Sequence, residues 1–190
     1  MRQFLFSIYR FCSWEIFKIR VSLKKYFLQL NPDIFIAKGV SIDSTVSIEL
    51  RFGGRIKLGE GVQLNDHAKL ITYGGNIVIG NNSKINAFTV ICGHGNVEIG
   101  DEVLIAPHCM IIPANHIFDH SDIPFRLQGE SKKGIKIGNN VWIGNGCSIL
   151  DGVTIGDNVV IAAGSVVNKS IPSGVLAGGV PVKIIKTLFS

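Results

Sequence analysis

Aliphatic residues recur at every sixth position over most of the chain. They form six triplets: Ile36, Ile42 and Ile48; Leu58, Leu64 and Leu70; Ile79, Ile85 and Ile91; Ile99, Ile105 and Ile111; Ile137, Ile143 and Ile149; Ile155, Ile161 and Val167. A small or β-branched residue, such as Val40, Ser83 or Cys109, stands four positions after most of them. A helix would require spacings of three and four, and an amphipathic strand would require strict alternation. A short fixed period of this kind is typical of a solenoid, whose repeats bury their apolar positions by stacking.

Three such sixes make one triangular turn of about eighteen residues. The runs are rich in Val and Ile and are broken by Gly, Asn and Asp, as in Ile79-Gly80-Asn81-Asn82. These residues accept the positive φ of tight corners better than most. Extra residues must be allowed between some triplets, but none is needed from Ile137 to Val167. We therefore predict an all-β solenoid, a parallel β-helix of about six turns and roughly 29 Å in height.

The repeat divides the 190 residues into three parts. We expect a helical segment at 1–32, the β-helix at 33–171 and a C-terminal tail at 172–190. A hydrophobic content of 46% suits one such domain with appendages. The repeat breaks at 113–134, and a loop of this length in a compact domain is usually functional or disordered. Because this loop is dense in His, Asp, Glu, Asn and Arg, we expect it to be functional.

The net charge of +5 comes from the N-terminal segment. Residues 1–30 contain six basic residues and the single acid Glu15, so the β-helix itself is neutral. No basic stripe interleaved with aromatic residues follows, and nucleic-acid binding is not expected. The segment is also aromatic, and its charges argue against a transmembrane span or a signal peptide. Two interpretations remain: a helix on an anionic membrane surface, or a helix that caps the first turn or packs between subunits.

The four cysteines suggest a reducing, cytoplasmic environment. Cys92, Cys109 and Cys147 fall within the repeats, where thiols can fill inner positions as small hydrophobic groups, and Cys12 lies in the N-terminal segment. No CxxC pair occurs, so neither a disulfide framework nor a zinc site is expected.

Several motifs resemble those of the hexapeptide-repeat acyltransferases. They are Asn115-His116, Gln128-Gly129, Ile137-Gly138-Asn139-Asn140-Val141-Trp142, Leu150-Asp151-Gly152-Val153, Ala163-Gly164-Ser165-Val166 and Gly178-Gly179-Val180-Pro181. The resemblance covers about residues 58–186 and is closest to sugar O-acetyltransferases of the maltose and galactoside type. It implies a left-handed β-helix, a homotrimer with active sites between adjacent subunits, acetyl-CoA as donor and no metal.

The chemistry of such a transfer requires a base. A sugar hydroxyl must lose its proton as its oxygen attacks the thioester, and the pKa of His suits this role. His116 lies in the interrupting loop, where the family carries its catalytic His, although a buried structural His is the alternative. We predict that His116 is the general base and then returns the proton to the CoA thiolate. Glu130, in preference to Asp119, is expected to orient it.

The resemblance also assigns residues to the acceptor. Asn86 precedes His116 by the separation at which the family places an Asn that hydrogen-bonds the sugar, although a structural corner Asn is almost as good an explanation. Asn115 and His94 complete the predicted acceptor set. Relatives acting on simple galactosides carry an acidic residue near His94. This departure favours another glycan, such as a nucleotide-linked or lipid-linked precursor of a cell-surface polysaccharide, lipopolysaccharide or capsule.

For the donor, the resemblance implies a groove between two β-helices. The residues predicted to contact CoA are Trp142, Asn145, Ala163, Asn168, Lys183 and Lys186. The two lysines would meet its phosphates as point charges.

Three other functions compete with an O-acetyltransferase. A γ-type carbonic anhydrase needs two His five positions apart and a third ligand, but His116 and His120 are four apart and position 80 is Gly80. A noncatalytic trimeric assembly protein would not bind CoA. An N-acetyltransferase acting on an amino sugar is not separated by sequence from an O-acetyltransferase.

Overall fold

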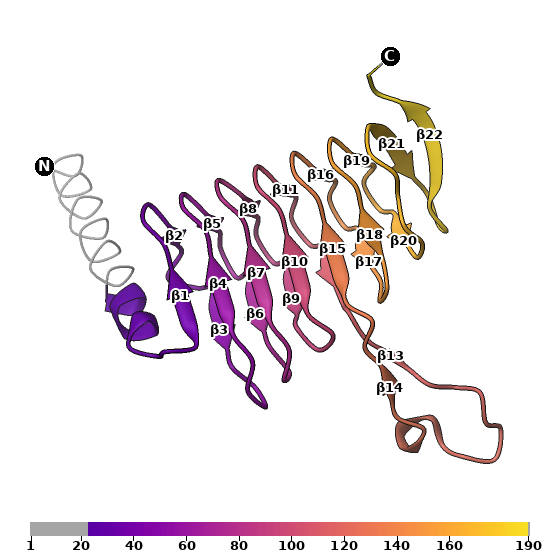
Figure 1. Cartoon of the computed structure of the whole chain (residues 1–190), viewed down its shortest axis with the longest axis horizontal. Coiled ribbons are helices and arrows are strands. Elements are labelled where there is room, and N and C mark those ends of the chain that lie inside the picture. Colours follow the sequence, from indigo (N-terminus) through magenta and orange to yellow (C-terminus); the bar gives the residue numbers. More distant parts are fainter. Residues whose placement is uncertain (1–22, 190) are drawn as a thin grey trace, which may run out of the picture.

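The structure is a computed structural model that describes residues 23–189. In it the chain winds into a column of six turns, and most turns contribute one short strand to each of three parallel sheets, A, B and C (Figure 1). The predicted parallel β-helix of about six turns is confirmed.

The strands follow one another from sheet A to B to C in each turn. Sheet A contains β1 (Ile34–Ile36), β4 (Ile56–Leu58), β7 (Ile77–Ile79), β10 (Val97–Ile99), β15 (Ile135–Ile137) and β18 (Thr154–Ile155). Sheet B contains β2 (Ser41–Ile42), β5 (Gln63–Leu64), β8 (Lys84–Ile85), β11 (Leu104–Ile105), β16 (Trp142–Ile143), β19 (Val160–Ile161), β21 (Val175–Gly178) and β22 (Lys183–Thr187). Sheet C contains β3 (Ser47–Glu49), β6 (Lys69–Ile71), β9 (Val90–Cys92), β12 (Met110–Ile111), β17 (Ser148–Ile149) and β20 (Val166–Val167). The final pair, β21 and β22, is antiparallel.

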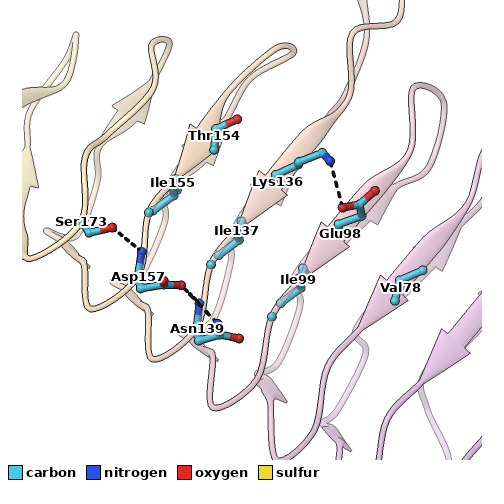
Figure 2. Close-up of a pocket in the computed structure, with 13 residues that line it drawn as sticks. Val78, Glu98, Ile99, Lys136, Ile137, Asn139, Thr154, Ile155, Asp157 and Ser173 are labelled. Carbon is cyan, nitrogen blue, oxygen red and sulfur yellow. Dashed lines mark hydrogen bonds and ion pairs between the residues drawn. The ribbon is translucent and has the colours of Figure 1, made fainter.

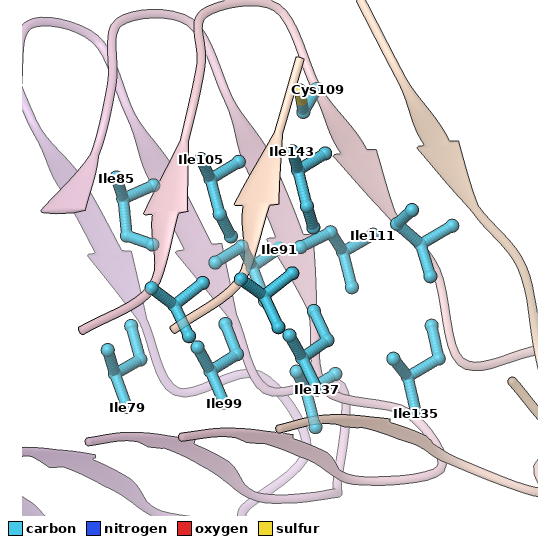
Figure 3. Close-up of a cluster of buried hydrophobic side chains, with 14 of the residues drawn as sticks. Ile79, Ile85, Ile91, Ile99, Ile105, Cys109, Ile111, Ile135, Ile137 and Ile143 are labelled. Carbon is cyan, nitrogen blue, oxygen red and sulfur yellow. The ribbon is translucent and has the colours of Figure 1, made fainter. Parts of the chain in front are cut away.

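The repeat positions form the core of the column. Every residue of the six predicted triplets is buried except Ile48, which is partly buried and packs against the others. Figure 3 shows isoleucines of successive turns, such as Ile85, Ile105 and Ile143, lying in a row inside the column. Burying one such side chain fully contributes about 1.5–3 kcal/mol, so the stacked turns stabilise one another.

The cysteines of the repeats are part of this core. Cys109 and Cys147 are fully buried, and Cys92 is nearly so. The thiols of Cys109 and Cys147 donate to the carbonyl oxygens of Gly144 and Ala162, both at 3.2 Å. Their predicted role as small hydrophobic groups is confirmed, while Cys12 lies outside the described residues.

The glycines that directly follow the strands of sheet A, such as Gly80 and Gly138, have a different role from the one predicted. They sit where a neighbouring turn approaches closely: a Cβ on Gly80 would lie 2.4 Å from Asp101 Oδ1, and one on Gly138 would lie 2.4 Å from Asp157 Oδ1. The positive φ angles of this corner lie two positions later, at Asn82, Glu102, Asn140 and Asn158 and at Gly39, Gly61 and Gly174. Glycine is therefore required for space directly after the strand, while Gly and Asn take the left-handed position as predicted.

Departures from the period occur at the corner between sheets C and A. The intervals across this corner are ten positions from Ile48 to Leu58, nine from Leu70 to Ile79, eight from Ile91 to Ile99 and twenty-six from Ile111 to Ile137. All intervals across the other two corners are six. The C/A corner is thus where the chain carries structure beyond the scaffold.

Residues 23–29 form a helix at the first turn of the column (Figure 1). Lys24 Nζ donates to the carbonyl oxygens of Ser44, at 2.8 Å, and Val46, and Lys25 Nζ donates to that of Val40 at 3.3 Å. Leu28 packs against the core. This part of the helix therefore caps the first turn, as one of the two interpretations predicted; the rest of the segment, 1–22, lies outside the described residues. Within residues 23–189, no helix has the length and apolar character needed to cross a bilayer.

Candidate active site

The long interruption is an antiparallel ribbon that leaves the column after β12 (Figure 1). Its strands are β13 (Asn115–His116) and β14 (Glu130–Ser131), which pair Asn115 with Ser131 and His116 with Glu130. A short 3-10 helix, η1 (Phe125–Leu127), lies near the tip. The register pairs His116 directly with Glu130, although the two residues are fourteen positions apart in the sequence.

His116 and Glu130 face each other across this ribbon. His116 Nε2 lies 4.0 Å from Glu130 Oε1, and the two side chains are 64% and 32% exposed. Glu130 also pairs with Lys132 Nζ at 3.3 Å. The distance between the imidazole and the carboxylate exceeds a hydrogen bond, but catalytic contacts commonly shorten when substrate binds. Of the two carboxylates predicted for this role, Glu130 lies beside the ring of His116.

Asp151, which was not predicted to be a site residue, anchors the base of the ribbon. Its carboxylate accepts hydrogen bonds from Ser131 Oγ at 3.0 Å and from the amides of Lys133 and Gly134 at 2.8 and 3.0 Å. Asp151 lies on the turn that follows the ribbon, and its proximity to residues 131–134 depends on the length of that turn. The sequence shows the motif around Asp151 but not its hydrogen bonds to the ribbon.

Gln128 closes the outer part of the loop. Its Nε2 donates to the carbonyl oxygens of His120 and Ile123 at 2.7 and 2.6 Å, and its Oε1 accepts from the amide of His120 at 3.1 Å. The loop is thus held by its own side chains. The imidazole of His120 is exposed and takes no part in these bonds.

His94 lies near the ribbon on the preceding turn. Its ring stacks on Tyr73 with the centroids 4.3 Å apart, and its Nδ1 is buried without a hydrogen-bond partner among the described residues. Burial lowers the pKa of His94; the carboxylate of Glu130 opposes this shift and the ammonium of Lys132 adds to it. Burial of the ring therefore favours the neutral form of His94. Asn115, the other predicted acceptor residue beside His116, is exposed.

Asn86 lies at the corner between sheets B and C, across sheet C from the ribbon. Its Nδ2 donates to the carbonyl oxygen of Ile105 at 2.7 Å, and its Oδ1 accepts from Asn65 Nδ2 at 2.9 Å. The amide thus links neighbouring turns. Within one chain the structure does not bring Asn86 and His116 together.

Most of the residues predicted to contact CoA lie along sheet B and its edge. Asn145 and Ala163 occupy the B/C corner on successive turns and are exposed. Trp142, 52% exposed on β16, lies in the same register line as Lys186 of β22, through Val160 and Leu176. Lys183 is also on β22. Asn168 is an exception. It follows β20 and lies at the C/A corner, whereas Asn145 lies at the B/C corner on the other side of sheet C.

A groove of about 330 Å³ follows the outer face of sheet B beside Trp142. Its apolar lining includes Leu104, Val160, Leu188 and Phe189. This surface could hold an apolar chain next to the exposed indole.

A second groove, of about 590 Å³, lies on sheet A and contains none of the predicted site residues (Figure 2). Its charged side chains Glu98 and Lys136 pair with each other at 3.2 Å. Asp157 Oδ1 accepts from the amide of Asn139 at 2.6 Å, and Ser173 Oγ accepts from the amide of Asp157 at 3.0 Å. These polar groups are bound to one another and to the backbone of neighbouring turns. The larger volume of this groove therefore does not mark it as the reactive site. Within residues 23–189, no three His, Cys, Asp or Glu side chains gather as a metal centre would require.

Comparison with known proteins agrees with the repeat. The family model described as bacterial transferase hexapeptide (six repeats) matches residues 134–169. A hexapeptide-repeat acetyltransferase of Vibrio cholerae, solved with acetyl coenzyme A, is 35% identical, with a TM-score of 0.64 over 70% of this chain and 71% of its own. The chain belongs to the hexapeptide-repeat acyltransferase family. The predicted resemblance is confirmed.

Other members of this family differ in the groups they modify. The galactoside O-acetyltransferase of Escherichia coli K12 is 47% identical over 118 residues, which cover 62% of this chain and 57% of the relative. A variant of AntD, an N-acyltransferase of Bacillus cereus solved with dTDP-4-amino-4,6-dideoxyglucose and coenzyme A, is 26% identical, with a TM-score of 0.75 over 88% of this chain and 90% of its own. The chain spans 55–58% of the length of the first curated relatives that it matches.

Proposed function

We propose that this protein transfers an acetyl group from acetyl-CoA to a hydroxyl of a saccharide. The observation that carries the proposal is the pairing of His116 with Glu130 on a ribbon that leaves the scaffold of a hexapeptide-repeat acyltransferase. The solved relative with bound acetyl coenzyme A and the galactoside O-acetyltransferase support the donor and the acceptor class.

The proposed reaction needs no covalent enzyme intermediate, because the thioester is already activated. The imidazole of His116 takes the hydroxyl proton as the sugar oxygen bonds to the acetyl carbon. The bond from carbon to sulfur then breaks, and the imidazolium gives its proton to the CoA thiolate. A positioned base of this kind typically contributes about 10²–10⁴ to the rate. Glu130 would hold the ring and stabilise the imidazolium.

We place the active site between two subunits of a homotrimer. His116 and Asn168 lie at the C/A corner, whereas Asn86, Asn145 and Ala163 lie at the B/C corner of the same chain. A site that used both sets would need one corner from each of two copies. In this arrangement the pantetheine arm of CoA would lie beside Trp142, and the lysines of β22 would meet its phosphates.

The acceptors that we propose are precursors of cell-surface polysaccharide, lipopolysaccharide or capsule. His94 stands where relatives acting on simple galactosides carry an acid, which disfavours those small sugars. The helix at 23–29 exposes Leu23, Tyr26 and Phe27 while its lysines cap the column, so it could also rest on an anionic membrane. Co-sedimentation of the full chain with phosphatidylserine vesicles would test that contact, and no binding at low salt would contradict it.

The proposed function is tested by thiol release from acetyl-CoA in the presence of sugars, sugar nucleotides and glycolipid precursors. We expect one acceptor class to stimulate release by the wild type and His116→Ala to lose that stimulation. His120→Ala is the matched control, because this imidazole is exposed in the same loop. If acetyl-CoA does not bind, the noncatalytic assembly role replaces the proposal.

An N-acyltransferase acting on an amino sugar is the second candidate. The similarity to AntD along 88% of this chain favours it. The two products are separated by hydroxylamine, which cleaves an O-acetyl ester and leaves an amide intact. A hydroxylamine-resistant product on an amino-sugar nucleotide would establish the second candidate.

A further inference from the structure

Three aromatic rings lie in a row along the C/A corner of the turns that precede the ribbon; Tyr73 and His94 are stacked, whereas Phe52 is tilted by 31° against Tyr73. The ring centroids of Phe52 and Tyr73 are 6.4 Å apart, and those of Tyr73 and His94 are 4.3 Å apart. We call these three residues the aromatic ladder. They stand in the corners that are two to four positions longer than the regular six, so the chain departs from its repeat where it presents these rings.

The ladder is built closely into the scaffold. A Cβ on Gly54 would lie 2.0 Å from the carbonyl oxygen of Gly75, and one on Gly75 would lie 2.2 Å from that of Gly93, so these extended corners pack backbone against backbone. Phe52 and Tyr73 have φ angles of 57° and 46°, and corner residues elsewhere in the column, such as Phe88 at 58° and His108 at 59°, share this conformation. The positive φ is therefore a recurring feature of the corners, and the added length of its corners is what distinguishes the ladder.

The two ends of the ladder differ. At one end His94 precedes Gly95, which packs against the backbone of Lys132 and Gly134 at the base of the ribbon that carries the proposed catalytic base. At the other end Phe52 is 87% exposed, which is unusual for a large apolar ring. Between them Arg51 Nη1 donates to Tyr73 Oη at 3.3 Å, and a salt bridge to Glu49 at 2.6 Å holds the guanidinium. A strip of rings and polar groups thus runs from the ribbon toward the N-terminal end of the column.

We infer that the aromatic ladder is an extended acceptor subsite, on which sugar units beyond the acetylated one are held. This inference rests on the proposed function and narrows its acceptor to an oligosaccharide. Sugar rings present apolar C–H faces and hydroxyl edges, and aromatic rings with adjacent polar groups complement both. The ladder is longer than a single sugar ring, so a monosaccharide at His116 would leave Phe52 unused.

A second set of stacked rings lies at another corner of the column. His67, Phe88 and His108 stack at the B/C corner with centroids 4.9 and 5.1 Å apart. The next turn carries Gly146 at this position, so the stack ends without reaching the ribbon of its own chain. Within one chain, the ladder is the set of rings that lies at the same corner as the proposed base.

The test is kcat/KM for acceptors of increasing length, from the monosaccharide identified in the acceptor panel to its oligosaccharides. The wild type should prefer the longer acceptors. Phe52→Ala should lose about threefold to tenfold on them and nothing on the monosaccharide. Phe52→Tyr should retain the preference. Phe35→Ala is the control, because Phe35 is also exposed in the first turn but lies on sheet A.

Calorimetry separates this inference from the proposed function, because binding of a fixed probe, an oligosaccharide released from lipopolysaccharide, to the full chain requires neither turnover nor an acceptor identified by activity. A Kd weakened by Phe52→Ala and not by Phe35→Ala supports the subsite even if no acetyl transfer is found. Equal Kd values for the two variants, or a loss for Phe52→Ala that is the same at every acceptor length, overturn the inference.

Discussion

The corners between sheets A and B and between sheets C and A use similar polar residues in different ways. At the A/B corner, Asn81, Asp101, Asn139 and Asp157 each accept a hydrogen bond from a backbone amide of the preceding turn, at 2.6–2.9 Å. At the C/A corner, the side chains of His116 and Glu130 extend on a ribbon away from the column.

The difference shows that residue type alone does not reveal function in this fold. At the A/B corner, these Asn and Asp side chains satisfy the backbone of the neighbouring turn. In the longer C/A corners, Asn76 and Asn96 still accept from the backbone amides of Arg55 and Asn76, both at 2.9 Å, but the added length also brings in residues without this role, such as His116 and Glu130. Interval length across a corner is therefore the better guide, and it points to the ribbon and the aromatic ladder.

The largest expected effect is that of His116→Ala on turnover. Loss of the base should lower kcat by about 10²–10⁴. The melting temperature should not change, because the imidazole is exposed and contacts no core residue. Steady-state thiol release and thermal unfolding measure the two quantities. A variant that keeps its kcat would remove His116 from the mechanism.

Glu130→Gln should have the next largest effect. The amide keeps the shape of the side chain but removes the charge that would stabilise an imidazolium. We expect kcat to fall about tenfold to a hundredfold, the equivalent of the ~1.5–3 kcal/mol of a hydrogen bond to a charged group. Asp119→Asn is the control, since loss of this other carboxylate of the loop should leave kcat unchanged. A larger loss for Asp119→Asn would reverse the assignment.

Asp151→Ala tests whether the base of the ribbon positions His116. The ribbon would lose three hydrogen bonds from Ser131, Lys133 and Gly134. We expect a severalfold lower kcat with little change in KM for acetyl-CoA, and faster amide exchange at Lys133 and Gly134. Partial recovery in Asp151→Asn, which retains one acceptor oxygen, would support positioning. Faster exchange with unchanged kcat would show that the anchor is irrelevant to turnover.

Asp157→Ala should affect stability and leave turnover unchanged. The amide of Asn139 would lose its acceptor, at a cost of about 1 kcal/mol. For a chain of this size the melting temperature should fall by roughly 2–4 °C. Asp157→Asn, which keeps an acceptor oxygen, should melt close to the wild type. A lower kcat for Asp157→Ala would place chemistry at the A/B corner and break the comparison.

The core could be predicted from the sequence because a β-helix is specified by local period. Each inner position, such as Ile105 or Ile143, is fixed by its distance from the previous corner, and no long-range pairing has to be guessed. The role of Gly80 and Gly138 was predicted wrongly, because it depends on contacts between turns and not on the local period. The space available at Gly80 or Gly138 depends on a side chain about twenty residues away.

The site could be predicted only in part for the same reason. Glu130 could be proposed for His116 because both lie in one loop of the sequence. Asp151, Gln128 and the stacked Tyr73 were missed, because their contacts depend on the length of each turn or on how the loop folds. The extra residues at the C/A corner were visible as gaps in the period, but only the structure places them all at one corner.

The central claim is tested most directly by acceptor-dependent thiol release from acetyl-CoA, measured for His116→Ala and Asp157→Ala beside the wild type at equal concentrations of folded protein. We expect a rate at least about 10² lower for His116→Ala and an unchanged rate for Asp157→Ala. Wild-type turnover by His116→Ala, or equal losses in the two variants, would contradict it.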